Sequence, residues 1–196
     1  MFYPCKPARI TVQGRLFVKK EYDFNWIAEL SIPGIRCLAH HHHNRVDLWS
    51  RGSMRITAPL VETRRQIKNM IPDETILDGV LFHQEGEGRV NNHYFVFDIP
   101  QFKNRETGQL WERFALLQSL DKGQPLIKIT EHHQPRHKRT FYYQSVGTQG
   151  VSGIVLKDLS SIYPIGTKSI KITDSWLEVR PNHSILEDIL KSNKIY

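Results

Sequence analysis

The sequence predicts a mixed α+β chain with much antiparallel sheet. Segments rich in apolar and β-branched residues, many of them alternating, recur along its length. Two segments between them, residues 60–70 and 111–120, have apolar residues at helical spacing. Gly, Pro and Asn residues separate several neighbouring segments by short turns, which favours antiparallel pairing.

Composition narrows the class of protein further. A chain of 196 residues that is 39% hydrophobic and 24% charged fits one soluble globular domain rather than a disordered chain. No apolar run approaches the roughly 18 residues of a membrane span, and the N-terminus does not resemble a secretory signal. Cys5 and Cys37 make no disulfide framework, so we expect a reducing, cytoplasmic location and no membrane partner. The net charge of +7 is compatible with a polyanionic partner.

The individual elements are expected as follows. Helix 60–70 begins after Pro59 and ends before Pro72, and a last short helix covers 184–191. A turn of His40–His43 with Asn44 and a loop over 85–92 each connect two strands. Residues 9–19, with Gly14 at a turn, are expected to form a hairpin or a strand entry. The other expected strands are 24–31, 35–39, 46–49, 76–82, 93–99, 126–130, 140–146, 153–156, 169–172 and 176–179.

Seven short motifs occur in order over about residues 14–173. They are EYDFNW (21–26), LWSRG (48–52), ILDGV (76–80), YFVFDI (94–99), LWERFALL (110–117), SGIVLK (152–157) and SIKIT (169–173), the last approached by YPIGTKS (163–169). In this order the chain resembles the covalent nucleotidyltransferase superfamily of ATP-dependent DNA ligases, RNA ligases and mRNA capping enzymes. That family's patterns are Lys-x-Asp-Gly (commonly followed by an arginine), Ser-Arg, Leu-Asp-Gly-Glu, Phe-Asp, Glu-Arg, Glu-Gly-x-Val-x-Lys and x-Lys-x-Lys.

The resemblance implies a fold of two antiparallel sheets that flank a nucleotide cleft, the ligase-type nucleotidyltransferase (ATP-grasp-like) domain. The family usually adds an OB-fold domain after the basic strand. Only 23 residues follow Thr173, too few for that barrel. We therefore expect a nucleotidyltransferase-like core over 1–175, a strand and helix extension over 176–196, and no OB-fold domain.

The resemblance also implies a chemistry. In the family a lysine attacks the α-phosphate of ATP or GTP, and Mg²⁺ offsets the phosphate charge. The corresponding aromatic residue, here Phe97, stacks on the base, and Lys157 corresponds to a lysine that reaches the α-phosphate. The nucleotide-binding residues implied for this chain are Glu21, Asp23, Arg51, Asp78, Phe97, Lys157 and Lys171.

The sequence departs from the family where the chemistry occurs. Glu21 falls at the nucleophilic lysine, and a carboxylate cannot form a lysyl-nucleotide. Val80 and Ser152 replace acidic residues, while Phe24 and Trp26 replace the glycine and the arginine of the first motif. The sequence therefore predicts a domain that binds a nucleotide or a nucleic-acid end without covalent catalysis.

Two alternatives remain open. A β-bulge could shift the register and make Lys20 the nucleophile of an active ATP-dependent DNA or RNA ligase. The chain could instead be a structural or assembly protein, with a protein partner, that kept only the fold. Asp23 and Asp78 are also typical of turns and strand ends, and Phe97 is equally typical of a core. The residue types distinguish neither ATP from GTP nor RNA from DNA.

Two further clusters have simpler interpretations. The histidines 40–43 cannot all face one ion from a strand, because neighbouring side chains alternate, so we expect an exposed turn and no functional metal site. The basic loop 131–139 offers Arg136, Lys138 and Arg139 for contacts to a nucleic-acid backbone. The alternative for that loop is a solvated charged segment.

Overall fold

The computed structural model describes residues 3–58, 60–86, 89–146, 148, 151–165 and 172–181, with the backbone alone over 83–91. The chain divides into two compact units. One consists of Met1–Lys6, Pro33–Glu131 and Leu159–Ile172, and the other of Pro7–Ile32, His132–Asp158 and Thr173–Tyr196. The predicted fold class, α+β with two mostly antiparallel sheets, is confirmed. Within the described residues, no helix is long and apolar enough to cross a membrane.

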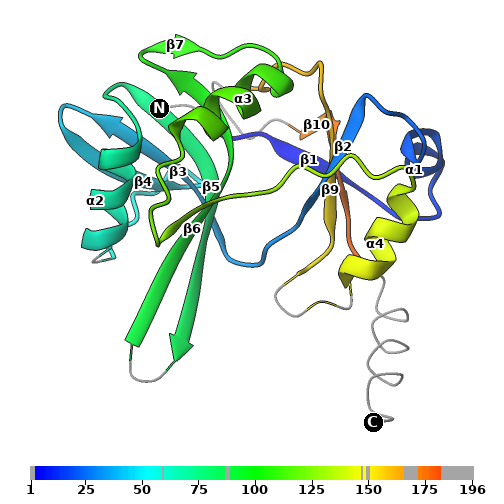
Figure 1. Ribbon diagram of the computed structural model, residues 1–196, viewed down its shortest axis with the longest axis horizontal. Helices are drawn as coiled ribbons and strands as arrows, with labels where there is room; N and C mark the ends of the chain where they lie inside the picture. Colours follow the sequence, from blue (N-terminus) through cyan, green and yellow to red (C-terminus); the bar gives the residue numbers. More distant parts are fainter. Residues whose placement is uncertain are drawn as a thin grey trace. The chain divides into compact units, whose positions relative to one another are not determined.

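The first unit is built on a six-stranded sheet (Figure 1). Five strands follow the order β4-β3-β5-β6-β7, and β8 pairs with β6 in parallel. The strands are β3 (Ile35–His42), β4 (Arg45–Ser50), β5 (Thr75–Gly86), β6 (Arg89–Phe102), β7 (Arg105–Glu106) and β8 (Ile127–Ile129). His43 and Asn44 both have positive φ angles, 47° and 63°, which is the geometry of a tight hairpin turn between β3 and β4.

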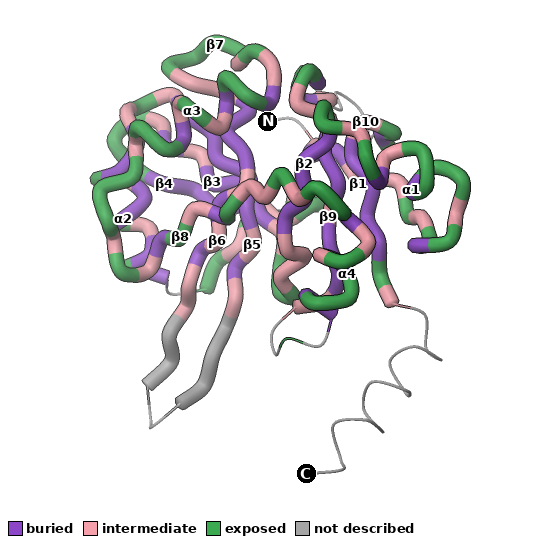
Figure 2. Tube along the Cα trace, turned by 45° about the vertical axis from the view of Figure 1, so that its right-hand side comes forward, coloured by how far each residue is buried: buried purple, intermediate pink, exposed green. Residues whose placement is uncertain are grey.

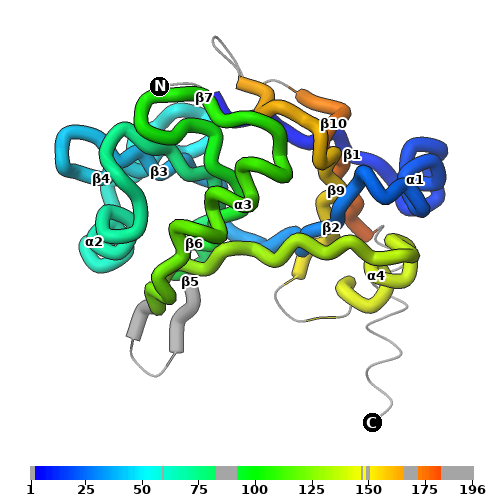
Figure 3. Tube along the Cα trace, turned by 45° about the horizontal axis from the view of Figure 1, so that its top comes forward, coloured from blue at the N-terminus to red at the C-terminus, as the bar shows by residue number. Residues whose placement is uncertain are grey.

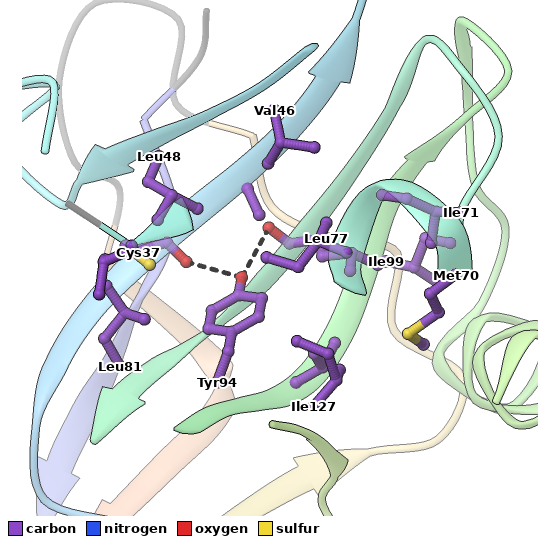
Figure 4. Close-up of a cluster of buried hydrophobic side chains, with 14 of the residues drawn as sticks. Cys37, Val46, Leu48, Met70, Ile71, Leu77, Leu81, Tyr94, Ile99 and Ile127 are labelled. Carbon is purple, nitrogen blue, oxygen red and sulfur yellow. Dashed lines mark hydrogen bonds between the residues drawn. The ribbon is translucent and has the colours of Figure 1, made fainter. Parts of the chain in front are cut away.

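Two helices pack on one face of this sheet. They are α2 (Val61–Met70) and α3 (Leu110–Leu120), and both agree with the predicted helices to within a residue. Their apolar side chains join those of the strands in one buried cluster, part of which Figure 4 shows. In its centre the hydroxyl of Tyr94 donates to the carbonyl oxygens of Cys37, at 3.0 Å, and Leu77, at 3.2 Å. The cluster therefore buries a phenol without leaving its hydroxyl unsatisfied.

The second unit contains a four-stranded sheet in the order β1-β10-β9-β2 (Figure 3). The strands are β1 (Lys6–Ile10), β2 (Trp26–Leu30), β9 (Ile154–Asp158) and β10 (Ile172–Val179). Two helices belong to the unit, α1 (Arg15–Lys20) and α4 (Lys138–Val146). Phe17 of α1 and Tyr142 of α4 are buried in a second apolar cluster with side chains of β2, β9 and β10. Figure 2 shows β2, β9 and β10 as mostly buried.

Two segments expected to be extended, within 9–19 and over 140–146, are helical instead. In the hairpin or strand entry predicted over 9–19, the chain turns at Gly14 as expected, where its amide donates to the Thr11 carbonyl, but the residues after the turn form α1 and not a strand. The strand predicted over 140–146 is α4, although its Phe-Tyr-Tyr run favours a strand. In α4 the helical spacing buries Tyr142 and Val146 together, so packing overrides the local preference.

Smaller differences concern loops. The expected histidine turn is mainly strand, because β3 continues to His42 and His41 is buried. Most of the expected loop over 85–92 is strand instead, since β5 runs to Gly86 and β6 begins at Arg89. Of the strand expected over 169–172, residues 169–171 lie outside the described residues. The helix expected over 184–191 lies entirely outside them.

Both cysteines are protected, which gives a direct test of the core. Cys5 and Cys37 are fully buried, and burial raises the pKa of the Cys5 thiol to about 11 and raises that of Cys37 as well. We expect iodoacetamide at about pH 8 to alkylate neither thiol in the native chain and both in urea. Because both thiols stay neutral in the fold, the free energy of unfolding should fall as pH rises from 9.0 through about 11. Rapid alkylation of the native chain would contradict the burial.

Candidate functional site

One face of the six-stranded sheet brings together two of the residues implied by the family pattern, Asp78 and Phe97. Both contact Arg36 of β3. Its Nε donates to Asp78 Oδ1 at 3.1 Å, and its guanidinium carbon lies 5.1 Å from the centre of the Phe97 ring. Because their neighbours Cys37 and Val96 point into the core, Arg36 and Phe97 point to the opposite face. Phe97 remains partly exposed there.

The carboxylate of Asp78 is fully buried and has several partners. Arg36 binds both of its oxygens, and the Tyr163 hydroxyl donates to Oδ2. Arg36 also donates to the carbonyl of Cys5. Burial alone would lower the pKa of Arg36, but Asp78 holds that pKa well above its usual value. Burial and the Asp78 charge raise the pKa of Tyr163. The network therefore fixes a charged guanidinium beside the Phe97 ring.

Arg36 belongs to a segment that sequence reasoning missed. Residues 31–36 read SIPGIR, so Gly34 and Arg36 have the spacing of the glycine and arginine in the family's first motif. Gly34 has a positive φ angle of +146°, and a Cβ atom there would collide with the carbonyl oxygen of Leu81, so the position requires glycine. The segment also leads directly into the β3–β4 hairpin, after which the Ser-Arg motif follows. Residues 21–26 have β2 between them and that hairpin.

This second register places Ser31 where the family has its nucleophilic lysine, and Ser31 contacts Ser152. Their hydroxyl oxygens are 3.2 Å apart, and the Ser152 hydroxyl and amide both donate to the Ser31 carbonyl, at 2.9 and 2.7 Å. The Ser31 amide donates to the Gly153 carbonyl at 2.9 Å. Gly153 has φ +145°, as the Glu-Gly motif would allow. Two departures from the family pattern are therefore hydrogen-bonded to each other.

Lys157 is buried in an ion pair in the second unit. Its Nζ lies 2.7 Å from the carboxylate of Glu29, and His132 Nε2 lies 2.6 Å from the same carboxylate. The ammonium also lies 4.3 Å from the centre of a Trp176 ring. Burial alone would raise the pKa of Glu29, but Lys157 and His132 hold it below its usual value. An incoming phosphate would have to compete with Glu29 for this ammonium.

Lys20, Glu21 and Asp23 do not lie on a strand. Lys20 ends α1, where its Nζ is 3.3 Å from Asp23 Oδ2 and 4.6 Å from the Trp26 ring centre. The expected choice between strand alternation and a β-bulge at Lys20 is therefore wrong, because α1 is helical. Glu21 is buried, and Arg139 binds both of its carboxylate oxygens.

The basic segment 131–139 is not a uniform loop. Lys138 and Arg139 begin α4, and Lys138 is buried with its Nζ 2.9 Å from the Asp23 carbonyl oxygen. Burial lowers the pKa of Lys138. Of the three cations proposed for a nucleic-acid backbone, Arg136 is exposed. Arg51 is exposed in the turn after β4, and Lys171 lies outside the described residues.

The described residues do not fit the divalent metal site of the family. Among them no three His, Cys, Asp or Glu side chains converge as a metal site requires. The buried carboxylates of Asp78 and Glu29 already bind cationic side chains. Val80, which stands where the family has an acidic residue, has no side-chain oxygen. The expectation of no functional metal site stays a prediction for the whole chain.

The comparisons with known proteins address the fold. No family model matches the chain. A prophage-derived DNA ligase-like protein, LigB of Bacillus subtilis (strain 168), is 27% identical over 175 residues, which are 80% of this chain and 62% of the relative. The chain thus spans less than two thirds of the curated relative that it matches.

Solved structures of DNA ligases are similar over nearly the whole chain. A mycobacterial DNA ligase D complexed with ATP and MES is 20% identical, with a TM-score of 0.73, over 91% of this chain and 60% of that one. The ligase domain of M. tuberculosis LigD is 21% identical, with a TM-score of 0.72, over 91% of this chain and 59% of that one. The bacteriophage T7 ATP-dependent DNA ligase is 18% identical, with a TM-score of 0.57, over 91% of this chain and 68% of that one. The resemblance to the covalent nucleotidyltransferase superfamily is confirmed, and the chain has the fold of the nucleotidyltransferase domain of ATP-dependent DNA ligases.

Proposed function

We propose that the chain is a ligase-like nucleotidyltransferase domain that binds a nucleotide or a nucleic-acid end without forming a covalent lysyl-nucleotide. The contact between Ser31 and Ser152 carries the proposal. In the register set by Gly34 and Arg36, these serines stand at the positions of the family's nucleophilic lysine and of a glutamate. A serine hydroxyl cannot form the phosphoramidate that the family's chemistry requires.

Lys20 is a poor substitute for the missing lysine. Its ammonium contacts the Asp23 carboxylate and lies over the Trp26 ring. Lys20 also ends the helix α1, whereas in the register set by Gly34 and Arg36 the nucleophile position is Ser31. The alternative of an active ligase that uses Lys20 is thereby disfavoured.

Binding of a nucleotide is supported by Phe97 and Arg36. Phe97 presents a partly exposed ring on a rigid strand, and an adenine or guanine base can stack on such a ring. Arg36 keeps its positive charge next to that ring. The similar mycobacterial and T7 ligases were solved with ATP, which makes ATP the first nucleotide to test.

The first experiment measures covalent and non-covalent binding on the same sample. We expect α-labelled ATP or GTP with Mg²⁺ or Mn²⁺ to leave no acid-stable label, while equilibrium dialysis with the same nucleotide detects binding. Phe97→Ala should weaken the binding by roughly 5-fold to 100-fold because a stacked base is lost. Trp111→Ala, a change of another exposed aromatic, is the matched control and should leave the affinity unchanged.

Three outcomes would contradict the proposal. Acid-stable, alkali-sensitive label that disappears in Lys20→Ala would establish the active ligase. Absence of any nucleotide or nucleic-acid binding at low salt would favour a structural or assembly protein. Equal binding by the wild-type chain and Phe97→Ala would place the nucleotide elsewhere.

A further inference from the structure

The turn between α1 and β2 exposes two aromatic rings that the core does not use. Tyr22 is 60% and Phe24 is 63% exposed, although each could stabilise the fold by burial. The Tyr22 ring makes an edge contact with His137, with centres 5.5 Å apart. One turn thus carries two exposed rings, two residues apart in the sequence.

Hydrogen bonds hold this turn in place. The Phe24 carbonyl accepts from Gln134 Nε2 at 2.8 Å, and the Asp23 carbonyl accepts from Lys138 Nζ at 2.9 Å. The Asn25 amide donates to Asp23 Oδ1 at 3.0 Å. The rings are therefore exposed on a backbone that is fixed from both sides, so little ordering is needed before a ligand stacks on them.

The surroundings of the turn are strongly basic. Residues 15–25 and 134–143 together carry six Lys and Arg residues and only two acidic residues. This excess of positive charge is more than half of the chain's net charge of +7. Both acidic residues have internal partners, Glu21 with Arg139 and Asp23 with Lys20. Lys19 and Arg136 are exposed. We call Lys19, Tyr22, Phe24 and Arg136 the basic–aromatic surface.

We propose that the basic–aromatic surface binds single-stranded nucleic acid, with bases stacked on Tyr22 and Phe24 and phosphates against Lys19 and Arg136. Cations interleaved with exposed rings are the combination that binds unpaired strands. A duplex hides the faces of its bases, and an acidic peptide has no such faces. The inference rests on the proposed function for the class of ligand, but it uses none of the residues proposed for the nucleotide.

The test uses fluorescence anisotropy of the full chain with labelled oligothymidylate, oligouridylate and a hairpin duplex. We expect both single strands to bind at low salt more tightly than the duplex. Tyr22→Ala and Phe24→Ala should each weaken binding about 5-fold or more. Lys19→Ala and Arg136→Ala should each lower the slope of log affinity against log salt by about 0.7. Trp111→Ala and Arg105→Ala are the matched controls, because both side chains are exposed in the other unit.

The outcomes separate this inference from the proposed function. Binding of ATP without binding of any oligonucleotide would overturn the inference and leave the nucleotide proposal standing. Equal affinity for duplex and single strand, with Tyr22→Ala and Phe24→Ala unchanged, would overturn base stacking. Tighter binding to vesicles of anionic lipid, lost in the same variants, would assign the surface to a membrane instead.

Discussion

Arg113→Met is expected to lower the free energy of unfolding by about 3–5 kcal/mol, because it leaves a buried carboxylate unpaired. Arg113 of α3 and Asp98 of β6 are both buried, with Nε 2.7 Å from Oδ1 and Nη2 3.1 Å from Oδ2. Arg113 Nη1 also donates to the carbonyls of Gly108 and Ser161, each at 2.8 Å. One guanidinium therefore connects a helix, a strand and two loops of the first unit.

Urea unfolding followed by circular dichroism measures this effect. Arg65→Met is the matched control, since Arg65 makes an ion pair with Glu62 on the exposed side of α2. We expect that control to leave the transition where it is in the wild-type chain. Asp98→Asn should also be destabilising, because it removes the charge that balances Arg113. An unchanged urea midpoint for Arg113→Met would show that the buried pair is dispensable.

Arg113 and Asp98 show which part of the structure could be predicted from the sequence and which could not. Both belong to motifs that indicated the fold, yet their contact links residues 15 positions apart through the tertiary structure. Helix 60–70 was predictable because its apolar spacing and flanking prolines are local signals. The helix α4 was not, because its Phe-Tyr-Tyr run locally favours a strand and its buried residues are held by contact with side chains of β2, β9 and β10. Such a contact, between residues far apart in the sequence, leaves no local pattern.

The position of the family's first motif also could not be predicted from local sequence alone. EYDFNW has the family's aspartate, while SIPGIR has its glycine and its arginine, so residue identity alone did not decide between them. The deciding facts are the close approach of Gly34 to Leu81 and the pairing of Arg36 with Asp78. Both depend on the pairing of β3 with β5, which the motif itself does not contain.

The two registers can be separated by restoring the chemistry. We expect the variant Ser31→Lys, Pro33→Asp, Val80→Glu, Ser152→Glu to acquire acid-stable, alkali-sensitive label from α-labelled ATP with Mg²⁺, where the wild-type chain has none. The variant returns the amine nucleophile together with the acidic residues that the family pattern has at these positions. Intact-mass measurement should show one added nucleoside monophosphate per labelled chain.

The matched control restores the other register, with Glu21→Lys and Phe24→Gly alongside the same changes at Val80 and Ser152. We expect it to stay unlabelled, because position 21 follows the helix α1, is buried and lies against Arg139, with which a lysine cannot pair. Label in this control, or label on the restored chain that requires Lys20, would return the nucleophile to residues 20–21. Label on a chain that carries the Ser31→Lys change alone would mean that one substituted position separates this protein from covalent chemistry. Label that also requires the Val80→Glu and Ser152→Glu changes would mean that covalent chemistry was lost together with the family's acidic, metal-binding residues.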